Sequence, residues 1–554
     1  MKWDQFFRAD ALAVIASACV VFYTLLTIIY SVGYMRGRKG LVRYYVYLVV
    51  TAVLSIAAVM SDNLVLFMTF WGLLALFLYL LINQGAGAQA SQTAKKTFII
   101  IGGTDTLMLL GLAFVWALTE MPELSRLAMT TVSIPVATGT AVAAYLLLLS
   151  GTLAKAGAMP FHTWVPDMAE NAPLPTVAFL PASLDKLVGI YFLLRLNLDM
   201  FVLRPGMQGL LMFIGSFTII AAVMMALVQH DLRRLLGYHA VSQVGYMVLG
   251  IATGVPLGIA GGTFHMLNHT LYKTGLFFAG GAVIHDSGTG DLDKLGGYAR
   301  KMPIVFWSFF VCALAIAGVP PLNGFVSKWM IYQSLVQTGE SGGGLWPVWL
   351  AAAMFGSALT LASFMKVLYA VFLAPPAGTL PEKEEASPFL WSPPAILAAV
   401  CVVFGVLAFR LPLRYLIDPV VDMPMAYSGD WHSVVGAVLI LLGLLVGIGV
   451  YAAGKIFKTR TVEPFIGGEV LANQPHMRLS GVDFYLTVEK APFLKTAYEA
   501  ALKKAFDVYE LGTKATFGVS KVFSGAHSGE LQVYLAWCLL GMIVLLLMMM
   551  GWSP

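Results

Sequence analysis

Charged residues are scarce in this sequence. Asp, Glu, Lys and Arg together make up 11% of its 554 residues, whereas hydrophobic residues make up 59%. Soluble domains carry roughly 25% charged residues, so this composition excludes a soluble protein and indicates a polytopic membrane protein. The net charge of +5 is small, which argues against nucleic-acid binding.

Cysteine is also rare, and the sequence contains no CxxC pair and no Cys/His cluster. These patterns ligate zinc, haem and iron–sulfur clusters, so we expect no metal, no cofactor and no catalytic redox site in this chain. The first apolar run lacks a small-residue cleavage site and predicts a retained helix, not a signal peptide. The four cysteines lie far apart in apolar runs: Cys19, Cys312, Cys401 and Cys538.

What the sequence has in abundance is apolar runs of membrane-spanning length. They predict an all-α membrane protein with about 14 transmembrane helices. The runs fall near 11–33, 44–60, 63–83, 98–118, 138–157, 174–196, 207–229, 239–254, 259–285, 304–336, 347–373, 391–409, 433–453 and 532–551.

Two of these predicted helices are interrupted. Lys155 comes just before Pro160, and the long run at 304–336 is broken by Pro320 and Pro321, with Lys328 after them. Proline breaks the helical hydrogen-bond ladder. The breaks lie five spans apart, which predicts two five-helix repeats of inverted topology. Two unrelated proline kinks in a large bundle are the alternative.

Basic residues gather in alternate loops. This bias predicts that those loops are cytoplasmic and that both termini lie outside. The membrane is expected to be the cytoplasmic (inner) membrane of a bacterium or archaeon. The basic residues are Arg36, Arg38, Lys39, Arg43, Lys95, Lys96, Arg233, Arg234, Lys294, Arg300 and Lys301.

The chain is expected to divide into six segments. Residues 456–531 mix lysines with apolar residues and lack a spanning run, which predicts a lateral amphipathic segment on the cytoplasmic face. The segments are an N-terminal helix (1–43), the first repeat (44–196), the second repeat (207–373), two further helices (374–455), the lateral segment (456–531) and a C-terminal anchor helix (532–554).

Several titratable residues fall inside the predicted spans. An intramembrane lysine costs roughly 3 kcal/mol and is expected to face the bundle interior or a wet path. His265, His269 and Lys273 are spaced four residues apart on one helix face, which suits a proton relay. Structural hydrogen bonding and a metal site are the alternatives for the histidines.

Two lysines of the first repeat also have simpler interpretations. Lys155 would be a snorkelling lysine if it lay at a helix end near the headgroups. Lys186 follows Asp185, and the two would then form only a local ion pair.

These residues resemble the antiporter-like subunits of respiratory complex I and their relatives in membrane-bound hydrogenases and Mrp cation/proton antiporters. The resemblance runs from about 24 to 373, and the lateral segment with its anchor resembles the large distal subunit of complex I. The motifs are Thr152-Leu153-Ala154-Lys155-Ala156, Pro160-Phe161-His162-Thr163-Trp164-Val165-Pro166-Asp167, Asp231-Leu232-Arg233-Arg234-Leu235-Leu236-Gly237-Tyr238, Ser242-Gln243-Val244-Gly245-Tyr246-Met247, Ala282-Val283-Ile284-His285, Leu295-Gly296-Gly297 and Pro321-Leu322-Asn323-Gly324-Phe325-Val326-Ser327-Lys328.

The resemblance implies a hydrated axis of lysines and histidines in the plane of the membrane, coupled to redox chemistry in other subunits. The implied axis residues are Lys155, Lys186, His265, His269, Lys273 and Lys328, supported by His162, Asp167, Asp185, Pro160, Pro320 and Pro321.

Two departures from the family stand out. The family has a glutamate after a tryptophan in the helix before the first lysine region, and it pairs with that lysine. Here Trp71 is followed by Gly72. Lys155 is then neutral at rest, dependent on a neighbouring subunit's carboxylate, or outside the usual cycle. The second departure is that two N-terminal helices of the family are expected to be missing.

The leading hypothesis is an ion-translocating subunit of a redox-driven membrane complex, of the NADH or ferredoxin dehydrogenase or hydrogenase type. Its expected partners are other membrane subunits, the lipid bilayer and protons or sodium ions, with protons favoured. The alternative is the membrane subunit of an ion-gradient-driven inorganic-carbon uptake system with a zinc-containing partner. A scaffold that has lost transport is a third possibility.

Overall fold

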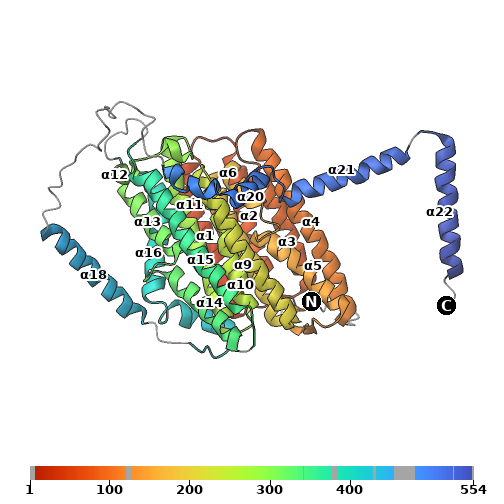
Figure 1. Cartoon of the computed structure of the whole chain (residues 1–554), viewed down its shortest axis with the longest axis horizontal. Helices are drawn as coiled ribbons and strands as arrows, with labels where there is room; N and C mark the ends of the chain where they lie inside the picture. The colour runs from red at the N-terminus through yellow and green to blue at the C-terminus, as the bar shows by residue number, and fades with distance from the viewer. Residues whose placement is uncertain are drawn as a thin grey trace. The chain divides into compact units, whose positions relative to one another are not determined.

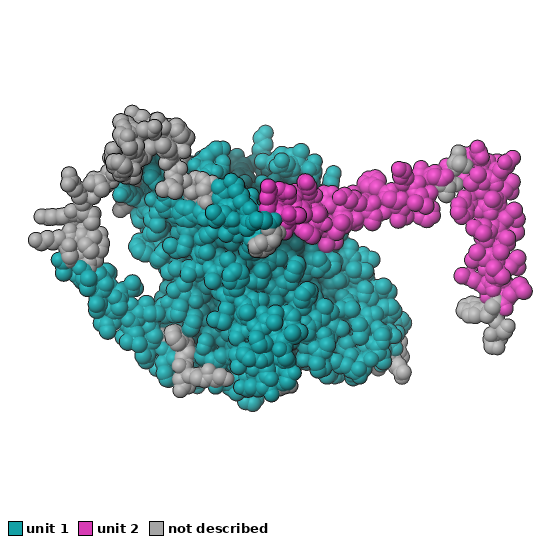
Figure 2. Space-filling view, viewed as in Figure 1, with its two compact units in different colours: residues 1–494 teal, residues 495–554 magenta. Residues whose placement is uncertain are grey.

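The computed structural model describes residues 6–119, 127–340, 342–376, 384–427, 432–453, 481–527 and 529–551. Residues 1–494 form one compact unit and residues 495–554 a second, smaller one (Figure 2). Nearly all regular structure is helical (Figure 1). Two short parallel strands, β1 (Ile134–Pro135) and β2 (Phe201–Val202), pair with Ile134 opposite Phe201.

The first half of the larger unit contains eight α-helices. The sixth predicted span is a helix with two π-helical turns, η4 (Leu180–Leu184) and η5 (Leu196–Met200). The α-helices are α1 (Ala11–Tyr34), α2 (Leu41–Met60), α3 (Leu64–Ile82), α4 (Gly87–Thr119), α5 (Gly139–Ala156), α6 (Trp164–Asn171), α7 (Leu174–Phe179) and α8 (Asp185–Arg195).

The second half continues with helices of similar length, and a π-helical turn, η7 (Leu368–Leu373), extends α15. The α-helices are α9 (Pro205–Leu227), α10 (Leu232–Ala252), α11 (Pro256–Ser287), α12 (Tyr298–Lys301), α13 (Pro303–Ala317), α14 (Asn323–Glu340), α15 (Trp346–Val367), α16 (Pro388–Val406), α17 (Asp418–Val421) and α18 (Ser433–Ala453). Shorter turns are η3 (Met129–Thr131), η6 (Leu292–Lys294), η8 (Leu413–Ile417) and η12 (Gly481–Tyr485).

The remaining helices are α19 (Leu486–Glu489), α20 (Pro492–Leu502), α21 (Val508–Ala526) and α22 (Leu531–Gly551). Residues 454–480, which open the predicted lateral segment, lie outside the described residues. The helix α21 falls in the part of that segment expected to be amphipathic, and α22 matches the expected anchor run.

All fourteen predicted runs are helical, and in the described part of the chain eleven helices are long and apolar enough to cross a membrane. Three runs account for the difference. The helix α11 carries the polar stripe, the run at 304–336 is divided into α13 and α14, and α18 has a shorter apolar stretch at Val434–Val450.

Polar side chains cap several helix starts, as expected where backbone N–H groups lack partners. Asn63 accepts a hydrogen bond from the backbone of Leu66 at the start of α3, and Thr138 does the same for Ala141 in α5. Asp231 caps α10 through the backbone N–H groups of Arg233 and Arg234.

The interior of the larger unit is formed by α7, α8, α10 and α11. Every residue of α7 and α8 is buried, and so is every residue of α11 from Leu257 to Ile284. The helix α1 packs on α11, because Tyr23 lies 2.7 Å from Thr270 and Tyr30 donates to the carbonyl of Phe278 at 2.9 Å. Lys186 of α8 and Lys273 of α11 are therefore fully buried.

Candidate functional site

The first broken helix ends in a glycine cap. Gly157, with φ +75°, follows α5, and its N–H and that of Ala158 donate to the carbonyls of Ala154 and Leu153 at 3.0 and 2.8 Å. Only glycine adopts this left-handed conformation without strain. A cis peptide bond joins Met159 to Pro160, and α6 begins four residues later at Trp164.

The second broken helix has the same cap. Gly318, with φ +83°, follows α13, and its N–H donates to the carbonyl of Ala315 while that of Val319 donates to Leu314, both at 3.0 Å. A cis peptide bond joins Pro320 to Pro321. In both breaks a cis proline lies three residues after the left-handed glycine, so the two interruptions have matching backbones.

Lys155 lies at the end of α5 and is 1% exposed. Its Nζ donates to the backbone carbonyl of Trp71 in α3 at 3.1 Å and lies 4.4 Å from the centre of that indole ring. A snorkelling lysine would instead reach the surface, so this alternative is wrong. Gly72 faces away, since apart from its chain neighbours and its own helix backbone no described atom lies within 4 Å of where a Cβ would be.

Lys186 of α8 points at the first break. A Cβ on Gly157 would lie 2.7 Å from its Nζ, which lies 5.7 Å from the ring of Trp164. Within the described ranges neither Lys186 Nζ nor Asp185 Oδ2 has a hydrogen-bond partner. These neighbours therefore form no hydrogen-bonded ion pair, although they act on each other electrostatically.

Lys328 of α14 lies over the second break. Its Nζ donates to the carbonyl of Ile316 at 2.9 Å and to that of Ala317 at 3.4 Å. These carbonyls end α13 and have no partner within their own helix, and a cation at a helix C-terminus is favourable. The same ammonium lies 4.6 Å from the ring of Tyr246.

The three residues of the α11 stripe are fully buried but differ in their contacts. His265 lies 2.9 Å from the hydroxyl of Ser327 through Nδ1 and 3.1 Å from Gln243 Oε1 through Nε2. Among the described residues, neither ring nitrogen of His269 has a hydrogen-bond partner. Lys273 Nζ has none there either. Both nitrogens of His265 are occupied, which disfavours the metal alternative.

The buried titratable side chains form one electrostatic series across both halves. Lys155 interacts with Asp185, and Lys186 interacts with Asp185, His269 and Lys273. His265 connects this group to Lys328. The six lysines and histidines that were predicted from the sequence as pathway residues thus all belong to this series.

Three further titratable residues belong beside this series, although the sequence reasoning missed them. His239 and Lys366 are fully buried, and Asp105 is partly buried. His239 lies 2.7 Å from the hydroxyl of Ser363 and interacts electrostatically with Lys273. Lys366 donates to the carbonyls of Leu227 and Gln229, both at 2.8 Å, and Asp105 accepts a hydrogen bond from Trp71. Each is an ionisable residue inside a predicted apolar run, and this signal could have found them.

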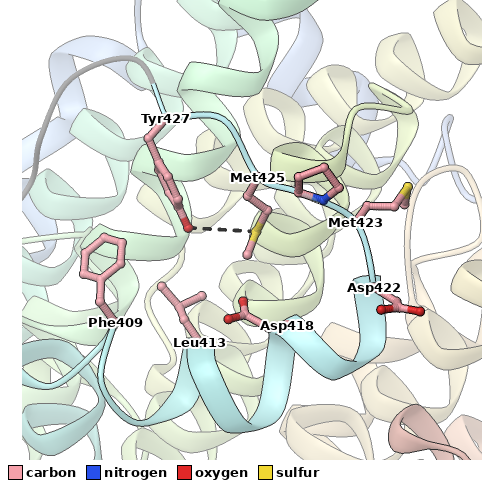
Figure 3. A pocket seen from close by; sticks show the side chains of 8 residues that line it. Phe409, Leu413, Asp418, Asp422, Met423, Met425 and Tyr427 are labelled. Atoms are coloured by element: carbon pink, nitrogen blue, oxygen red, sulfur yellow. Dashed lines mark hydrogen bonds between the residues drawn. The ribbon is translucent and has the colours of Figure 1, made fainter.

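An open pocket of about 580 Å³ lies apart from this series, between η8 and the segment after α17 (Figure 3). It is lined by Phe409, Leu413, Asp418 and Tyr427, and the Tyr427 hydroxyl lies 3.9 Å from Met425 Sδ. Burial raises the pKa of the Asp418 carboxyl above its ordinary value, and Arg414 opposes the rise.

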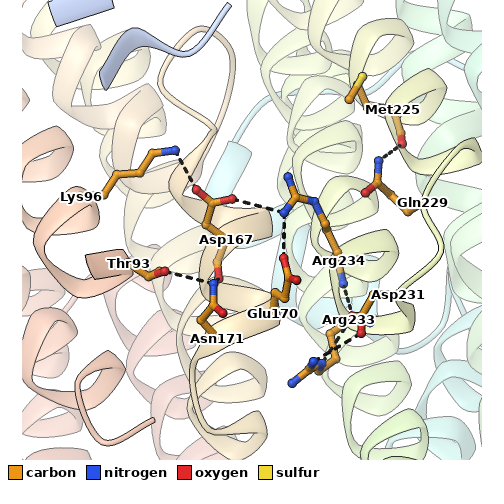
Figure 4. Close-up of polar contacts among 10 residues, drawn as sticks. All are labelled: Thr93, Lys96, Asp167, Glu170, Asn171, Met225, Gln229, Asp231, Arg233 and Arg234. Atoms are coloured by element: carbon orange, nitrogen blue, oxygen red, sulfur yellow. Dashed lines mark hydrogen bonds and ion pairs between the residues drawn. The ribbon is translucent and has the colours of Figure 1, made fainter. Parts of the chain in front are cut away.

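Asp167, expected to support the pathway, lies in an ion network that joins α4, α6 and α10 (Figure 4). Its carboxylate is 2.7 Å from Lys96 and 3.7 Å from Arg234, which also pairs with Glu170 at 2.7 Å. The network is partly exposed. His162 lies in the turn between α5 and α6, and its carbonyl accepts from Val165 at 2.9 Å.

The chain resembles proteins of known families along most of its length. The profile of the NADH:quinone oxidoreductase/Mrp antiporter membrane family matches residues 61–360, and that of the complex I chain 5 N-terminus matches residues 2–45. The second match begins before residue 24, where we expected the resemblance to start.

Three curated relatives illustrate the range of this resemblance. NADH-quinone oxidoreductase subunit L of Mycobacterium tuberculosis is 30% identical over 78% of this chain and 68% of its own length. F(420)H(2) dehydrogenase subunit L of Methanosarcina mazei is 29% identical over 72% of this chain and 63% of its own length. Na(+)/H(+) antiporter subunit A1 of Staphylococcus haemolyticus is 31% identical over 73% of this chain and 52% of its own length. The chain thus spans only about half to two thirds of the length of the last two.

Solved structures share the fold. A chain of the membrane-bound sulfane sulfur reductase, an archaeal respiratory membrane complex, has a TM-score of 0.79 at 23% identity and covers 98% of this chain and 89% of that one. A chain of the Mrp complex from Dietzia sp. DQ12-45-1b has a TM-score of 0.68 at 22% identity and covers 75% of this chain and 84% of that one. This chain belongs to the NADH:quinone oxidoreductase/Mrp antiporter membrane family.

Proposed function

We propose that this chain is an ion-translocating subunit of a redox-driven multi-subunit membrane complex, with protons as the ion. The observation that carries the proposal is a continuous series of buried titratable side chains. It runs through Lys155, Asp185, Lys186, Lys273, His269, His265 and Lys328. The named relatives are subunits of dehydrogenases and antiporters, which supports the same function.

The series suits ion movement because its members influence one another's charge. Two unit charges about 6 Å apart in surroundings of effective dielectric constant near 20 interact by roughly 3 kcal/mol. That is about two tenfold steps in a protonation equilibrium. A proton arriving at one lysine therefore biases whether its neighbours hold or release theirs.

The two breaks supply what a continuous helix could not. Freed carbonyls and helix ends accept cations at mid-membrane depth in transport proteins. Lys328 occupies one such end, and Lys186 packs against the other at Gly157. The matching caps support the proposal that α2–α8 and α9–α15 are two inverted five-helix repeats.

The proposed orientation follows the loop charges. The segments that carry Arg36, Lys96 and Arg300 face the cytoplasm, and both termini lie outside the cytoplasmic membrane. The lateral segment at 456–531, which includes α21, lies along the cytoplasmic face, and α22 anchors it.

The test begins with the partners. The chain is purified with its associated subunits, which are identified by mass spectrometry, and the complex is placed in sealed vesicles and driven with the substrate of its redox subunits. A pH-sensitive dye and a sodium-flux measurement then distinguish the two ions. Proton uptake or release coupled to turnover is the expected result. A zinc-containing partner without redox subunits, or turnover without ion movement, would overturn the proposal.

A further inference from the structure

Lys366 of α15 is fully buried and binds the end of α9. Its Nζ donates to the carbonyl of Leu227, the last residue of α9, and to that of Gln229, both at 2.8 Å. Gln229 lies in the turn between α9 and α10 and is only partly buried (Figure 4). The next side chain, that of His230, is 61% exposed. Lys366 therefore connects the interior of the larger unit with a turn at its surface.

Towards the interior, His239 of α10 lies next to this lysine. Ser363 is three residues before Lys366 on the same face of α15, and its hydroxyl lies 2.7 Å from His239 Nε2. Lys366 and Lys273 both act electrostatically on His239. The other ring nitrogen, Nδ1, is buried and has no hydrogen-bond partner among the described residues. The imidazole thus has one nitrogen held in place and a second nitrogen that can exchange a proton.

Phe364 contacts both His239 and the middle member of the buried series. Its ring centre lies 4.8 Å from that of the His239 ring and 6.0 Å from Lys273 Nζ. Within the described ranges Lys273 Nζ also lacks a hydrogen-bond partner. His239 and Lys273 are therefore separated by little more than one aromatic side chain, and a proton that moves between them passes beside its ring.

The equivalent place in the first repeat is occupied by fixed charges. In the proposed repeats α2 corresponds to α9 and α8 to α15, and a π-helical turn begins one residue after Arg195 and two residues after Lys366. Tyr191 donates to a carbonyl at the end of α2 at 2.6 Å. Arg195 donates to the Tyr191 hydroxyl and pairs with Asp10 at 2.6 Å and Asp199 at 2.9 Å. Arginine stays charged in proteins, so Arg195 cannot pass on a proton, whereas a lysine can.

We propose that Lys366 and His239 form a branch of the ion pathway that joins Lys273 to the turn between α9 and α10. The inference rests on the proposed function, because it takes Lys273 as a pathway group. In the proposed orientation this turn faces the cytoplasm, since basic residues follow it. Protons from the cytoplasm then enter the series at its middle, through the second repeat, without passing Lys155.

Access to position 363 tests the branch without requiring ion transport. The complex with Ser363→Cys is exposed to silver ions, which bind thiols, in inside-out and in right-side-out vesicles. The thiol that remains is then labelled with N-ethylmaleimide after denaturation and quantified by peptide mass spectrometry. Ser31→Cys is the matched control, because Ser31 is equally buried near the corresponding end of α1.

We expect silver added from the cytoplasmic side to protect the Ser363→Cys thiol about fivefold faster or more than the Ser31→Cys thiol, because a wetted path reaches only the former. Protection of the Ser363→Cys thiol should also be slower from the outer side. Equal rates in the two variants, or faster protection from the outer side, would overturn the inference.

Arginine at position 366 separates a proton-transfer role from a structural one. Lys366→Arg keeps donors for the two carbonyls but cannot release its proton, so it should lower ion translocation by about tenfold or more in the assembled complex. His239→Gln keeps a partner for Ser363 without a titratable ring and should lower it similarly. Lys301→Arg is the matched control, because Lys301 is also buried but pairs with Asp286.

Wild-type translocation in either Lys366→Arg or His239→Gln would contradict the inference, since the residue would then only cap a helix or fill space. If Lys366→Arg does not assemble, His239→Gln and the silver protection decide. If the wild-type vesicles move no ions, the proposed function fails on its own, and the silver protection still shows whether the branch opens to the cytoplasm.

Discussion

The Nζ of Lys328 donates to the carbonyl oxygen of Ile316 at 2.9 Å, so a lysine of α14, after the second break, caps the C-terminal end of α13, before it. Removing the amine should therefore have two effects. Lys328→Ala should lower ion translocation by about tenfold or more, because the series loses a titratable member. It should also lower the free energy of unfolding by about 1–3 kcal/mol, since buried carbonyls lose their donor.

Vesicle assays and thermal unfolding in detergent measure these two effects. Lys294→Ala is the control, because that side chain is 70% exposed at the end of η6. A Lys328→Ala variant as active as this control would place Lys328 outside the pathway.

Gly157, the glycine of the first break, tests the backbone geometry of the helix cap. Gly157→Ala should lower the free energy of unfolding by at least about 1–2 kcal/mol, the cost of an L-residue in the left-handed region. The added methyl would also lie 2.6 Å from Val165 Cγ2 and 2.7 Å from Lys186 Nζ. Gly206→Ala in α9 is the matched control, since apart from its chain neighbours and its own helix backbone no described atom lies within 4 Å of the added Cβ. Equal stability of the two variants would contradict the described cap.

The two histidines of α11 should separate transport from stability. His265→Phe leaves Ser327 and Gln243 without their shared partner and should lower the free energy of unfolding by about 1–3 kcal/mol. His269→Phe breaks no hydrogen bond with the described residues and should cost less than about 1 kcal/mol. Both should impair ion translocation. Unimpaired translocation in His269→Phe would remove this residue from the relay.

Replacing Asp167 should lower stability but leave ion translocation unchanged. Asp167→Asn loses the 2.7 Å ion pair with Lys96, and we expect a loss of about 1 kcal/mol in stability because the pair is partly exposed. Translocation per assembled complex should remain near the wild-type value. If it collapses while the complex stays assembled, Asp167 has the pathway role that its family motif suggested.

Much of the fold could be predicted because its signals are local. Apolar runs gave all fourteen helical segments, and Gly318 with Pro320 marked the division between α13 and α14. The spacing of His265, His269 and Lys273 placed them on one buried face. The π-helical turns η4 and η5, which contain Pro181 and Asn197, were not predicted from the apolar runs.

The parts of the site that could not be predicted depend on contacts between distant segments. Trp71 and Asp105 meet across 34 positions, and nothing in either run indicates the hydrogen bond between them. His239 was read as part of an apolar run, although its partner Ser363 lies 124 positions away. Spacing along one helix can be read from a sequence, whereas a pair formed between helices needs their packing.

The central claim is that ions cross this chain along the buried series, and Lys273 is its middle member. The most direct measurement is the number of ions moved per turnover by the intact complex in vesicles, with Lys273→Ala compared with Lys294→Ala. The account predicts a loss of about tenfold or more in Lys273→Ala alone, with both complexes fully assembled. Equal ion movement per turnover in the two variants would contradict it.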